Sequence, residues 1–507
     1  MTALPTKIDP RSPWTSDPLS PPDGTAWDLV VLGGGTAGIV AARTAAGFGA
    51  SVVLIESERP GGDCLWTGCV PSKALLAAAH TANTARTSAR FGIHTDEVRV
   101  DFAAVMARVH EVIAAIEPAD APVTLRAAGV HLAHATGRFT ASDTIGLDTG
   151  ERLRFRHALI ATGSRPNSPP IPGLADVDAL TSDDIWDLDE RPRRLLVLGG
   201  GSIGCEMAQA FARLGSEVTI VEAAERLLAH EDPAAGALLA ETLIEDGVQI
   251  HCGTQVVEVA AEGETITAHT DTGVRLQADR LLVAVGRRAN TEGLDLARAG
   301  ILVDSAAHPV VDERLRTSQP RVWAAGDVTG HPAFTHVAGV HGSLAASNAV
   351  LGLRRRVDLR HIPHLTYTQP EIASFGAAPG NPGTQTIDLP HAEVDRAVAE
   401  GAERGLTRLV LDRRGRVVGA SVVGVRAGEV LAELVVAARK GATAADLAGT
   451  MHAYPGFADA AWKPAIEAVR ERLARPATAW ATGRLAALQR WRHRPLDAAT
   501  EQERHRD

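Results

Sequence analysis

The chain has 507 residues, of which 45% are hydrophobic and 22% charged, and its formal net charge is −10. This composition excludes a wholly disordered, collagen-like or coiled-coil protein, and at about 150 residues per domain the length predicts about three domains. A negative net charge offers no basic field to a phosphate backbone, so we expect no nucleic-acid partner. The sequence has no apolar run of about 18 residues, which excludes a transmembrane helix.

The four cysteines are too few for a disulphide scaffold and predict thiols that are kept reduced. Residues 1–26 are rich in Pro, Ser and Asp and contain no apolar stretch, so they resemble neither a secretory signal nor a transit peptide. We therefore predict a disordered arm over residues 1–26 and a cytoplasmic location.

Two segments of the chain repeat the order strand, helix, strand. The first has β-branched runs at 28–33 and 51–56, and the second has similar runs at 194–199 and 217–222. Five residues of the first segment have a counterpart 166 positions later, and the pairs are Gly33 and Gly199, Gly35 and Gly201, Gly38 and Gly204, Gly49 and Gly215, and Glu56 and Glu222. The chain therefore contains an internal repeat.

Both repeats carry the pattern GxGxxG between a strand and a helix. These glycines make a tight turn, let backbone N–H groups approach a pyrophosphate and pack the helix on the sheet, while a carboxylate after the next strand binds ribose hydroxyls. One copy would mean little, but two copies in matching context predict two dinucleotide sites. Glu222 favours NADH over NADPH, because a carboxylate would repel a 2′-phosphate.

The fold class predicted from these elements is α/β, with two Rossmann-like dinucleotide-binding domains and an α+β C-terminal domain. A Pro-rich connection at 165–172 suits a crossing between domains. The predicted domains are a first dinucleotide-binding domain at 27–160 and 287–360, a second at 161–286, the C-terminal domain at 361–475, and a basic Trp/Arg tail at 476–507.

A pair of cysteines, Cys64 and Cys69, lies in the stretch GGDCLWTGCVPSK. Pro71 suits the first turn of a following helix, so Cys69 is expected at a helix N-terminus, where the dipole and free N–H groups favour thiolate. This context favours a functional pair over two buried structural thiols. Cys205 and Cys252 lack such surroundings and are expected to be structural.

Lysine is rare in this chain, which uses arginine almost everywhere and has lysine only at 7, 73, 440 and 463. Lys73 follows Cys69 by four residues, and a compact ammonium fits a site beside a redox ring better than a planar guanidinium does. Glu206, on the helix of the second repeat, is its candidate partner.

The C-terminal tail places Trp480, Leu485, Leu488 and Trp491 at helical spacing, with arginines alongside. A helix packed on its own protein or on a partner subunit is the favoured interpretation, and a helix on a membrane surface is the alternative. Pro476 and Gly483 weaken the case for a helix.

Through these motifs the sequence resembles the pyridine nucleotide-disulphide oxidoreductases of the glutathione reductase, dihydrolipoamide dehydrogenase and mercuric reductase type, over roughly residues 27–465. The resemblance implies FAD at the first GxGxxG, NAD(P)H at the second, where Glu222 favours NAD(H) over NADP(H), and a homodimer formed by the C-terminal domain. Residues at matching positions that it assigns to cofactor binding are Gly33, Gly35, Gly38, Glu56, Gly62, Asp63, Lys73, Ala161, Thr162, Gly163, Gly199, Gly201, Gly204, Glu222, Gly286, Gly326 and Asp327.

The resemblance also implies a mechanism. Hydride passes from nicotinamide to the flavin, the reduced flavin opens a Cys64–Cys69 disulphide, Cys69 remains as the flavin-facing thiolate, and Cys64 attacks the acceptor. Lys73 is implied near the flavin N5, paired to Glu206.

One stretch departs from the family pattern. Disulphide-reducing members have a His-Pro pair followed by a Glu, supplied by the partner subunit, and here Tyr454 and Asp459 stand at those two positions. A phenol, with an ordinary pKa of about 10, is a poor proton shuttle near neutral pH, and His452 could substitute for the missing imidazole. Tyrosine at this position is similar to mercuric reductases, but no cysteine pair is found in the tail that ends at Asp507.

The sequence therefore predicts an FAD enzyme that passes electrons from NADH through the Cys64–Cys69 pair to a small disulphide, a quinone or a metal ion. The alternatives are a mercuric reductase-like enzyme, a quinone or dye reductase that bypasses the dithiol, and a redox-sensing flavoprotein of low turnover. No bound metal cofactor is predicted.

Overall fold

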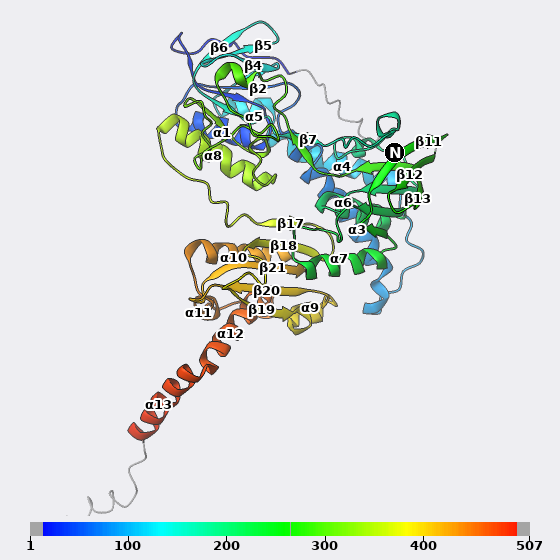
Figure 1. Cartoon of the computed structure of the whole chain (residues 1–507), viewed down its shortest axis with the longest axis vertical. Coiled ribbons are helices and arrows are strands. Elements are labelled where there is room, and N and C mark those ends of the chain that lie inside the picture. The colour runs from blue at the N-terminus through cyan, green and yellow to red at the C-terminus, as the bar shows by residue number, and fades with distance from the viewer. Residues whose placement is uncertain (1–13, 264, 494–507) are drawn as a thin grey trace, which may run out of the picture. The chain divides into compact units, whose positions relative to one another are not determined.

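A computed structural model describes residues 14–263 and 265–493 (Figure 1). The chain divides into two compact units, Met1–Pro370 and Glu371–Asp507. The C-terminal domain is predicted to start at residue 361, whereas the second unit starts at Glu371. The domain boundary at residue 361 stays a prediction.

The first dinucleotide-binding fold is built on a seven-stranded sheet. Strands β3, β2, β1, β6 and β16 are parallel neighbours, because their Val- and Leu-rich runs are buried on both faces. Strands β4 and β5 extend the sheet in antiparallel fashion from the first half of β6. The bounds of these elements are β1 (Trp27–Leu32), α1 (Thr36–Gly47), β2 (Val52–Glu56), β3 (Val130–His134), β4 (Gly137–Ala141), β5 (Thr144–Leu147), β6 (Arg152–Ile160), β16 (Val322–Ala324) and α8 (Thr335–Leu351).

The second dinucleotide-binding fold is a parallel sheet of four strands in the order β10-β9-β8-β14, with a three-stranded antiparallel sheet, β11-β12-β13, beside it in the chain. The elements are β8 (Arg194–Leu198), α6 (Ser202–Leu214), β9 (Glu217–Glu222), α7 (Pro233–Glu245), β10 (Gln249–Cys252), β11 (Val256–Glu262), β12 (Thr265–Thr270), β13 (Arg275–Ala278) and β14 (Arg280–Val283).

The chain crosses between the two folds twice, and the crossings pair with each other. Strand β7 (Ser164–Pro166) runs antiparallel to β15 (Arg287–Ala289), which places Arg288 opposite Arg165. The Pro-rich stretch after Arg165 is therefore a crossing segment, as its composition predicts.

Four α-helices lie between β2 and β3 in the described part of the first unit. They include α3, which begins at Cys69 with Gly68 as its N-cap, so Cys69 is the first helical residue. The bounds are α2 (Gly62–Trp66), α3 (Cys69–Arg86), α4 (Phe102–Ile116) and α5 (Pro122–Ala127), and strand β17 (His364–Thr366) follows later in the unit.

The segment before β1 differs from the expected disordered arm. The Asp17 backbone N–H donates to the Leu132 carbonyl at 2.8 Å, and the Asp17 carboxylate accepts the Leu132 N–H at 2.9 Å and pairs with Arg126 at 2.8 Å. The prediction of disorder is therefore wrong for residues 14–26, because polar side chains bind the edge strand β3 there. Residues 1–13 lie outside the described residues.

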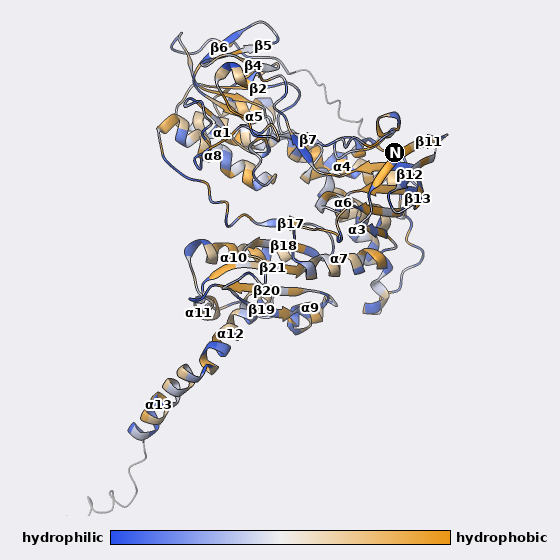
Figure 2. Ribbon diagram, viewed as in Figure 1, coloured by the Kyte–Doolittle hydropathy of each residue, from blue (hydrophilic) through white to orange (hydrophobic). Residues whose placement is uncertain are grey.

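The second unit contains an antiparallel sheet whose strands β18, β21, β20 and β19 are neighbours in that order. Apolar residues follow these strands in Figure 2, and β21 is almost wholly buried. The elements are β18 (Glu371–Gly376), β19 (Gln385–Pro390), α9 (Asp395–Ala399), β20 (Leu406–Leu411), β21 (Val417–Gly424), α10 (Ala427–Lys440), α11 (Ala444–Ala448), α12 (Asp459–Ala474) and α13 (Pro476–Arg492).

The tail forms a helix, α13, in which no residue is buried. Pro476 does not disrupt it, because it occupies the first turn, where its missing N–H and fixed φ are tolerated. Trp480 and Trp491 remain 63% and 68% exposed. The last residues of the predicted tail, 494–507, lie outside the described residues.

Helices α1 and α8 lie side by side, and glycine permits their close approach (Figure 1). A Cβ at Gly342 would overlap the backbone carbonyl of Ala37. At Gly339, one turn away on α8, the nearest heavy atom is Thr36 Cγ2 at 3.8 Å.

We expect Gly342→Ala to lower the free energy of unfolding of the apoprotein by about 2 kcal/mol or more, because the helices must separate. Gly339→Ala, the matched control, should be neutral or stabilising by up to about 1 kcal/mol through helix propensity. Urea unfolding followed by circular dichroism measures both. Equal effects of the two substitutions would contradict this packing.

Candidate active site

The first glycine turn has the geometry that a dinucleotide needs. A Cβ at Gly38 would overlap the Gly33 carbonyl, and one at Gly33 would overlap the Ala161 carbonyl, so side chains are excluded at both positions. Glu56 Oε2 accepts the Gly34 N–H at 2.7 Å, and Oε1 accepts the Glu58 N–H at 2.7 Å. Burial raises the pKa of the Glu56 carboxyl.

The second turn repeats this arrangement atom for atom at an offset of 166 residues. Glu222 Oε2 accepts the Gly200 N–H at 2.5 Å and Oε1 accepts the Ala224 N–H at 2.7 Å. A Cβ at Gly204 would overlap the Gly199 carbonyl, as at Gly38 and Gly33. The internal repeat therefore includes the hydrogen bonds of the two turns as well as their sequence.

Both turns fit a pyrophosphate. The N-caps of α1 and α6, Gly35 and Gly201, have extended backbones and no capping side chain, so the first N–H groups of each helix remain available. These residues fit FAD at the first turn and a pyridine nucleotide at the second.

The two cysteines of the predicted pair lie close enough to change each other's pKa. Cys64 lies in α2 and Cys69 begins α3, and both are free thiols in this structure. The pKa of Cys69 is lowered to about 6 by the neighbouring Cys64 thiol, by contact with Thr335 and by the charge of Lys73, which together outweigh the effect of burial. The neighbouring Cys69, with burial, raises the pKa of Cys64 far above that of an ordinary thiol. Cys69 is therefore the more acidic of the two thiols, in agreement with its place at the start of α3 and its contact with Thr335.

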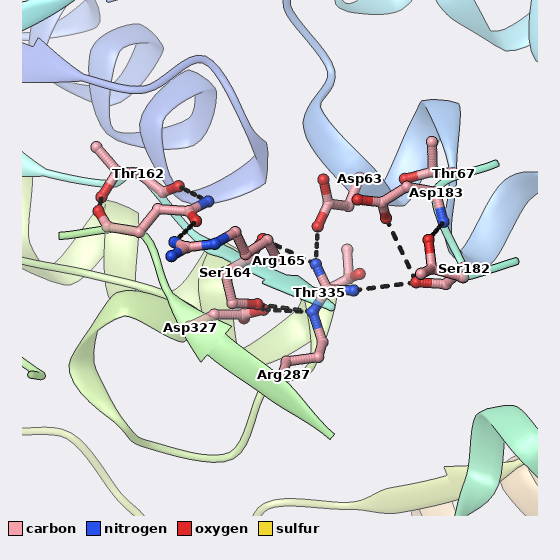
Figure 3. Close-up of polar contacts among 12 residues, drawn as sticks. Asp63, Thr67, Thr162, Ser164, Arg165, Ser182, Asp183, Arg287, Asp327 and Thr335 are labelled. Carbon is pink, nitrogen blue, oxygen red and sulfur yellow. Dashed lines mark hydrogen bonds and ion pairs between the residues drawn. The ribbon is translucent and has the colours of Figure 1, made fainter. Parts of the chain in front are cut away.

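Thr335 is the third member of this group. Its Oγ1 lies 3.3 Å from Cys69 Sγ, and it begins helix α8. A hydroxyl that donates to a thiolate stabilises the charged form. Thr335 is also drawn in Figure 3.

Lys73 and Glu206 form the ion pair that the sequence suggests. Lys73 Nζ lies 2.9 Å from Glu206 Oε2, and the Glu206 side chain is 6% exposed. Glu206 Oε1 accepts the backbone N–H of Tyr367 at 2.9 Å, and the Tyr367 ring lies 4.2 Å from Lys73 Nζ in a cation–π contact. Helix α6 of the second repeat thus fixes a lysine on the cysteine-bearing helix α3.

Arg287 links four segments of the first unit (Figure 3). Its guanidinium pairs with Asp63 and donates to Ser164 Oγ at 2.7 Å and to the Ser164 carbonyl at 2.8 Å. It also contacts Ser182 Oγ at 3.3 Å and lies 4.0 Å from Asp327. Arg287 therefore holds α2, and with it Cys64, against the crossing strand β7.

Asp63 lies near other carboxylates, and its pKa is raised. Burial raises its pKa to about 6, the charge of Arg287 opposes the rise, and the charges of Asp183 and Asp327 add to it. Asp327 in turn accepts a hydrogen bond from Ser164 Oγ at 2.7 Å.

Of the other residues expected at the cofactor sites, Thr162 and Gly163 lie between β6 and β7, and Asn290 anchors both by hydrogen bonds. Gly286 precedes β15, and its carbonyl accepts the Asn167 N–H at 3.0 Å. A Cβ at Gly62 would lie only 2.6 Å from Gly35 Cα, so a side chain does not fit there. A Cβ at Gly326 would lie 3.2 Å from the Ala37 Cβ.

Tyr454, His452 and Asp459 belong to the second unit. The Tyr454 hydroxyl donates to Asp395 at 2.5 Å, and this bond raises the pKa of the phenol. Both ring nitrogens of His452 are engaged, one with Glu433 at 2.9 Å and one with the Thr450 carbonyl at 3.0 Å. Asp459 is 1% exposed, its pKa is raised by burial, and its carboxylate has no partner among the described residues.

Cys205 and Cys252 behave as the sequence suggests. Cys205 is fully buried, and burial raises the pKa of both thiols.

The sequence did not predict Ser164, Ser182 and Thr335 as site residues, because they are ordinary hydroxyl residues in no motif. It also gave Arg287 no role, although this residue directly follows Gly286.

Two family profiles match this chain. The profile for the pyridine nucleotide-disulphide oxidoreductases matches residues 27–342, and the profile for the dimerisation domain of that family matches residues 362–465. The chain belongs to the pyridine nucleotide-disulphide oxidoreductases.

Individual relatives agree with this assignment. A mercuric reductase from Streptomyces lividans is 39% identical over 450 residues, which cover 86% of this chain and 95% of that protein. LpdA from Mycobacterium tuberculosis has a TM-score of 0.80 and 28% identity, covering 87% of this chain and 99% of LpdA. The Cu(II) complex of RclA, an HOCl-induced flavoprotein disulphide reductase from Escherichia coli, has a TM-score of 0.77 and 26% identity, covering 87% of this chain and 99% of RclA.

Membership of the family confirms the predicted fold and enzyme class. The protein is an FAD-dependent NAD(P)H oxidoreductase of the disulphide reductase type, with two dinucleotide-binding domains, and its dimerisation domain supports a homodimer. Within the described part of the chain, no helix is both long and apolar enough to cross a membrane. Over residues 14–263 and 265–493, no group of three or more His, Cys, Asp or Glu side chains could hold a metal ion.

The two glycine turns should be separable by mutation. We expect Gly38→Ala to abolish retention of FAD, and Gly204→Ala to keep FAD while weakening NADH binding at least tenfold, because in each case the new Cβ overlaps a carbonyl of the turn. Flavin absorbance of the purified protein and NADH titration measure the two effects. Gly47→Ala, where a Cβ meets nothing within 4 Å, is the control. Full FAD retention by Gly38→Ala would refute the assignment.

The low pKa of Cys69 predicts how alkylation of the reduced enzyme depends on pH. Only the thiolate reacts, so the rate at Cys69 should rise through a midpoint near pH 6 and level off above it. Cys64→Ala removes the neighbouring thiol and should move the midpoint to higher pH, whereas Cys252→Ser should leave it unchanged. Iodoacetamide labelling followed by mass spectrometry measures the rate at each cysteine, and a midpoint near that of an ordinary thiol would contradict the geometry.

Proposed function

We propose that this enzyme uses NADH to reduce a thiophilic metal ion through the Cys64–Cys69 pair. The observation that carries the proposal is the pair of free thiols, in which Cys69 begins helix α3 and its Sγ lies 3.3 Å from Thr335 Oγ1. Reduced, such a pair offers two soft ligands to one metal ion, and thiolates favour ions such as Cu(I) and Hg(II).

The residues of the first unit support each part of this role. FAD, when bound, accepts hydride from the pyridine nucleotide and passes two electrons to the disulphide. Lys73, held by Glu206, places a positive charge near the Cys69 thiolate and stabilises it. Arg287, paired with Asp63, fixes the helix that carries Cys64.

The departure at position 454 favours a metal ion over a disulphide as acceptor. Reduction of a disulphide releases a thiolate that must be protonated, and the family supplies an imidazole for this purpose. Tyr454 is a weaker acid than an ordinary phenol, because Asp395 accepts its hydrogen bond. Oxidation of the thiol–thiolate pair by a metal ion instead releases one proton, so no acid is needed.

The electron balance closes for both kinds of ion. One NADH and two Cu(II) give NAD⁺, a proton and two Cu(I), and one NADH and one Hg(II) give NAD⁺, a proton and Hg(0). The relatives are consistent with this chemistry, since one is a mercuric reductase and another is a disulphide reductase solved with Cu(II).

We propose NADH as the donor because Glu222 would repel a 2′-phosphate.

The test is an anaerobic stopped-flow screen of the NADH-reduced holoenzyme. We expect Cu(II) and Hg(II) to reoxidise it at least 100-fold faster than oxidised glutathione, lipoamide or a soluble quinone, and Cys64→Ala to lose metal turnover. Faster reoxidation by a disulphide would refute the proposal. Metal or quinone turnover that survives Cys64→Ala would show that electrons bypass the dithiol.

Tyr454 provides a matched pair of variants. Tyr454→Phe removes the hydroxyl and should leave metal turnover within about threefold, because no acid is required. Tyr454→His restores an imidazole and should raise disulphide turnover without raising metal turnover. A loss of metal turnover in Tyr454→Phe of tenfold or more would show that the phenol takes part.

A further inference from the structure

The segment before β1 lies against the end of the first dinucleotide site. The Trp14 indole donates from Nε1 to the Glu58 carbonyl at 2.8 Å, and its ring stacks on His134 with centroids 4.7 Å apart and planes 24° from parallel. Glu58 is the residue whose N–H binds Glu56, and His134 is the register partner of Glu56 across β2 and β3. The aromatic pair therefore adjoins the carboxylate expected to bind the adenosine ribose.

A set of polar contacts holds this segment in place. Asp17 binds both the backbone of Leu132 and the guanidinium of Arg126, and Arg126 also donates to the Thr15 carbonyl at 2.6 Å. Ser16 Oγ accepts the His134 N–H at 3.0 Å. Residues 14–19 thus form a strap, fixed along the edge strand β3 and ending with Trp14 over His134.

The second dinucleotide site is an internal comparison. Its turn has the same hydrogen bonds as the first, but Cys252 is the register partner of Glu222 where His134 is the partner of Glu56. The Ala224 carbonyl, which corresponds to that of Glu58, accepts the Gly253 N–H at 2.8 Å in place of an indole. The two sites therefore differ at the adenosine end and agree at the glycine turn.

We propose that the strap retains FAD, and that Trp14 and His134 are the residues that do so by closing the adenosine end of the first site. A flavin must stay bound through every turnover, whereas the pyridine nucleotide must exchange, yet the repeated turns alone would hold both alike. Trp14 and His134 add an apolar, π-rich surface beside the ribose carboxylate in the first site, where it would slow release of the adenosine moiety. The inference depends on FAD binding at the first turn and is independent of which acceptor the enzyme uses.

A purely structural role for the strap is the competing explanation. Edge strands are commonly covered, and the contacts of Asp17 with β3 would serve that purpose. Trp14, however, extends past the edge strand to the loop that follows β2, and edge protection does not require that contact.

Binding of each nucleotide to the full-length chain tests the proposal. We expect Trp14→Ala to raise the dissociation rate of FAD, followed by flavin fluorescence on dilution, at least tenfold, with the dissociation constant for NADH unchanged within twofold. Trp14→Phe, which keeps an aromatic ring, should recover most of the loss. Trp480→Ala, which removes an exposed tryptophan of α13, is the matched control and should change neither value.

Two further measurements separate retention from structural support. Asp17→Ala releases the strap and should raise the FAD dissociation rate about as much as Trp14→Ala does. The double variant, Trp14→Ala with Asp17→Ala, should release FAD no faster than the faster of the two single variants, because both substitutions act through the strap. The unfolding midpoint of the apoprotein should be the same for Trp14→Ala and wild type, whereas that of the holoprotein should fall. An unchanged FAD dissociation rate, a slower one, or equal losses of apoprotein and holoprotein stability would overturn the proposal.

Discussion

The chemistry of this enzyme depends on the difference in acidity between the Cys64 and Cys69 thiols. The pKa of Cys69, which begins helix α3 beside Thr335 and Lys73, is lowered, whereas the pKa of Cys64 is raised. Two thiols of the same kind thereby differ in how readily each gives up its proton.

Both nucleotide-binding folds and the crossing between them hold the sulphur pair. The first fold supplies helix α3, whose N-terminus begins at Cys69, and the second supplies Glu206, which fixes Lys73. The crossing strand β15 supplies Arg287, which binds Asp63 next to Cys64. Side chains from segments more than 200 residues apart therefore meet around one dithiol, and an error in packing either fold would displace a charge that the thiolate needs.

The sequence predicts those parts of the site that lie within a local motif. The glycine turns, Glu56 and Glu222, and the cysteine pair follow from spacing alone, and the rarity of lysine pointed to Lys73. The partners of Arg287 could not be predicted, because they come from four separate segments, and Thr335 lies 266 residues from the cysteine that it contacts. The docked strap was missed for a related reason: a polar composition resembles disorder, although the polar groups of Asp17 bind specific partners on an edge strand.

The most direct test of the central claim is the absorbance of the holoenzyme after anaerobic reduction with one equivalent of NADH. If Cys69 is the thiolate beside the flavin, a long-wavelength charge-transfer band should appear, fade as the pH falls through about 6, and be absent in Cys69→Ser. A band of equal strength in Cys69→Ser, or no band in the wild-type enzyme after it has taken up two electrons, would contradict the account.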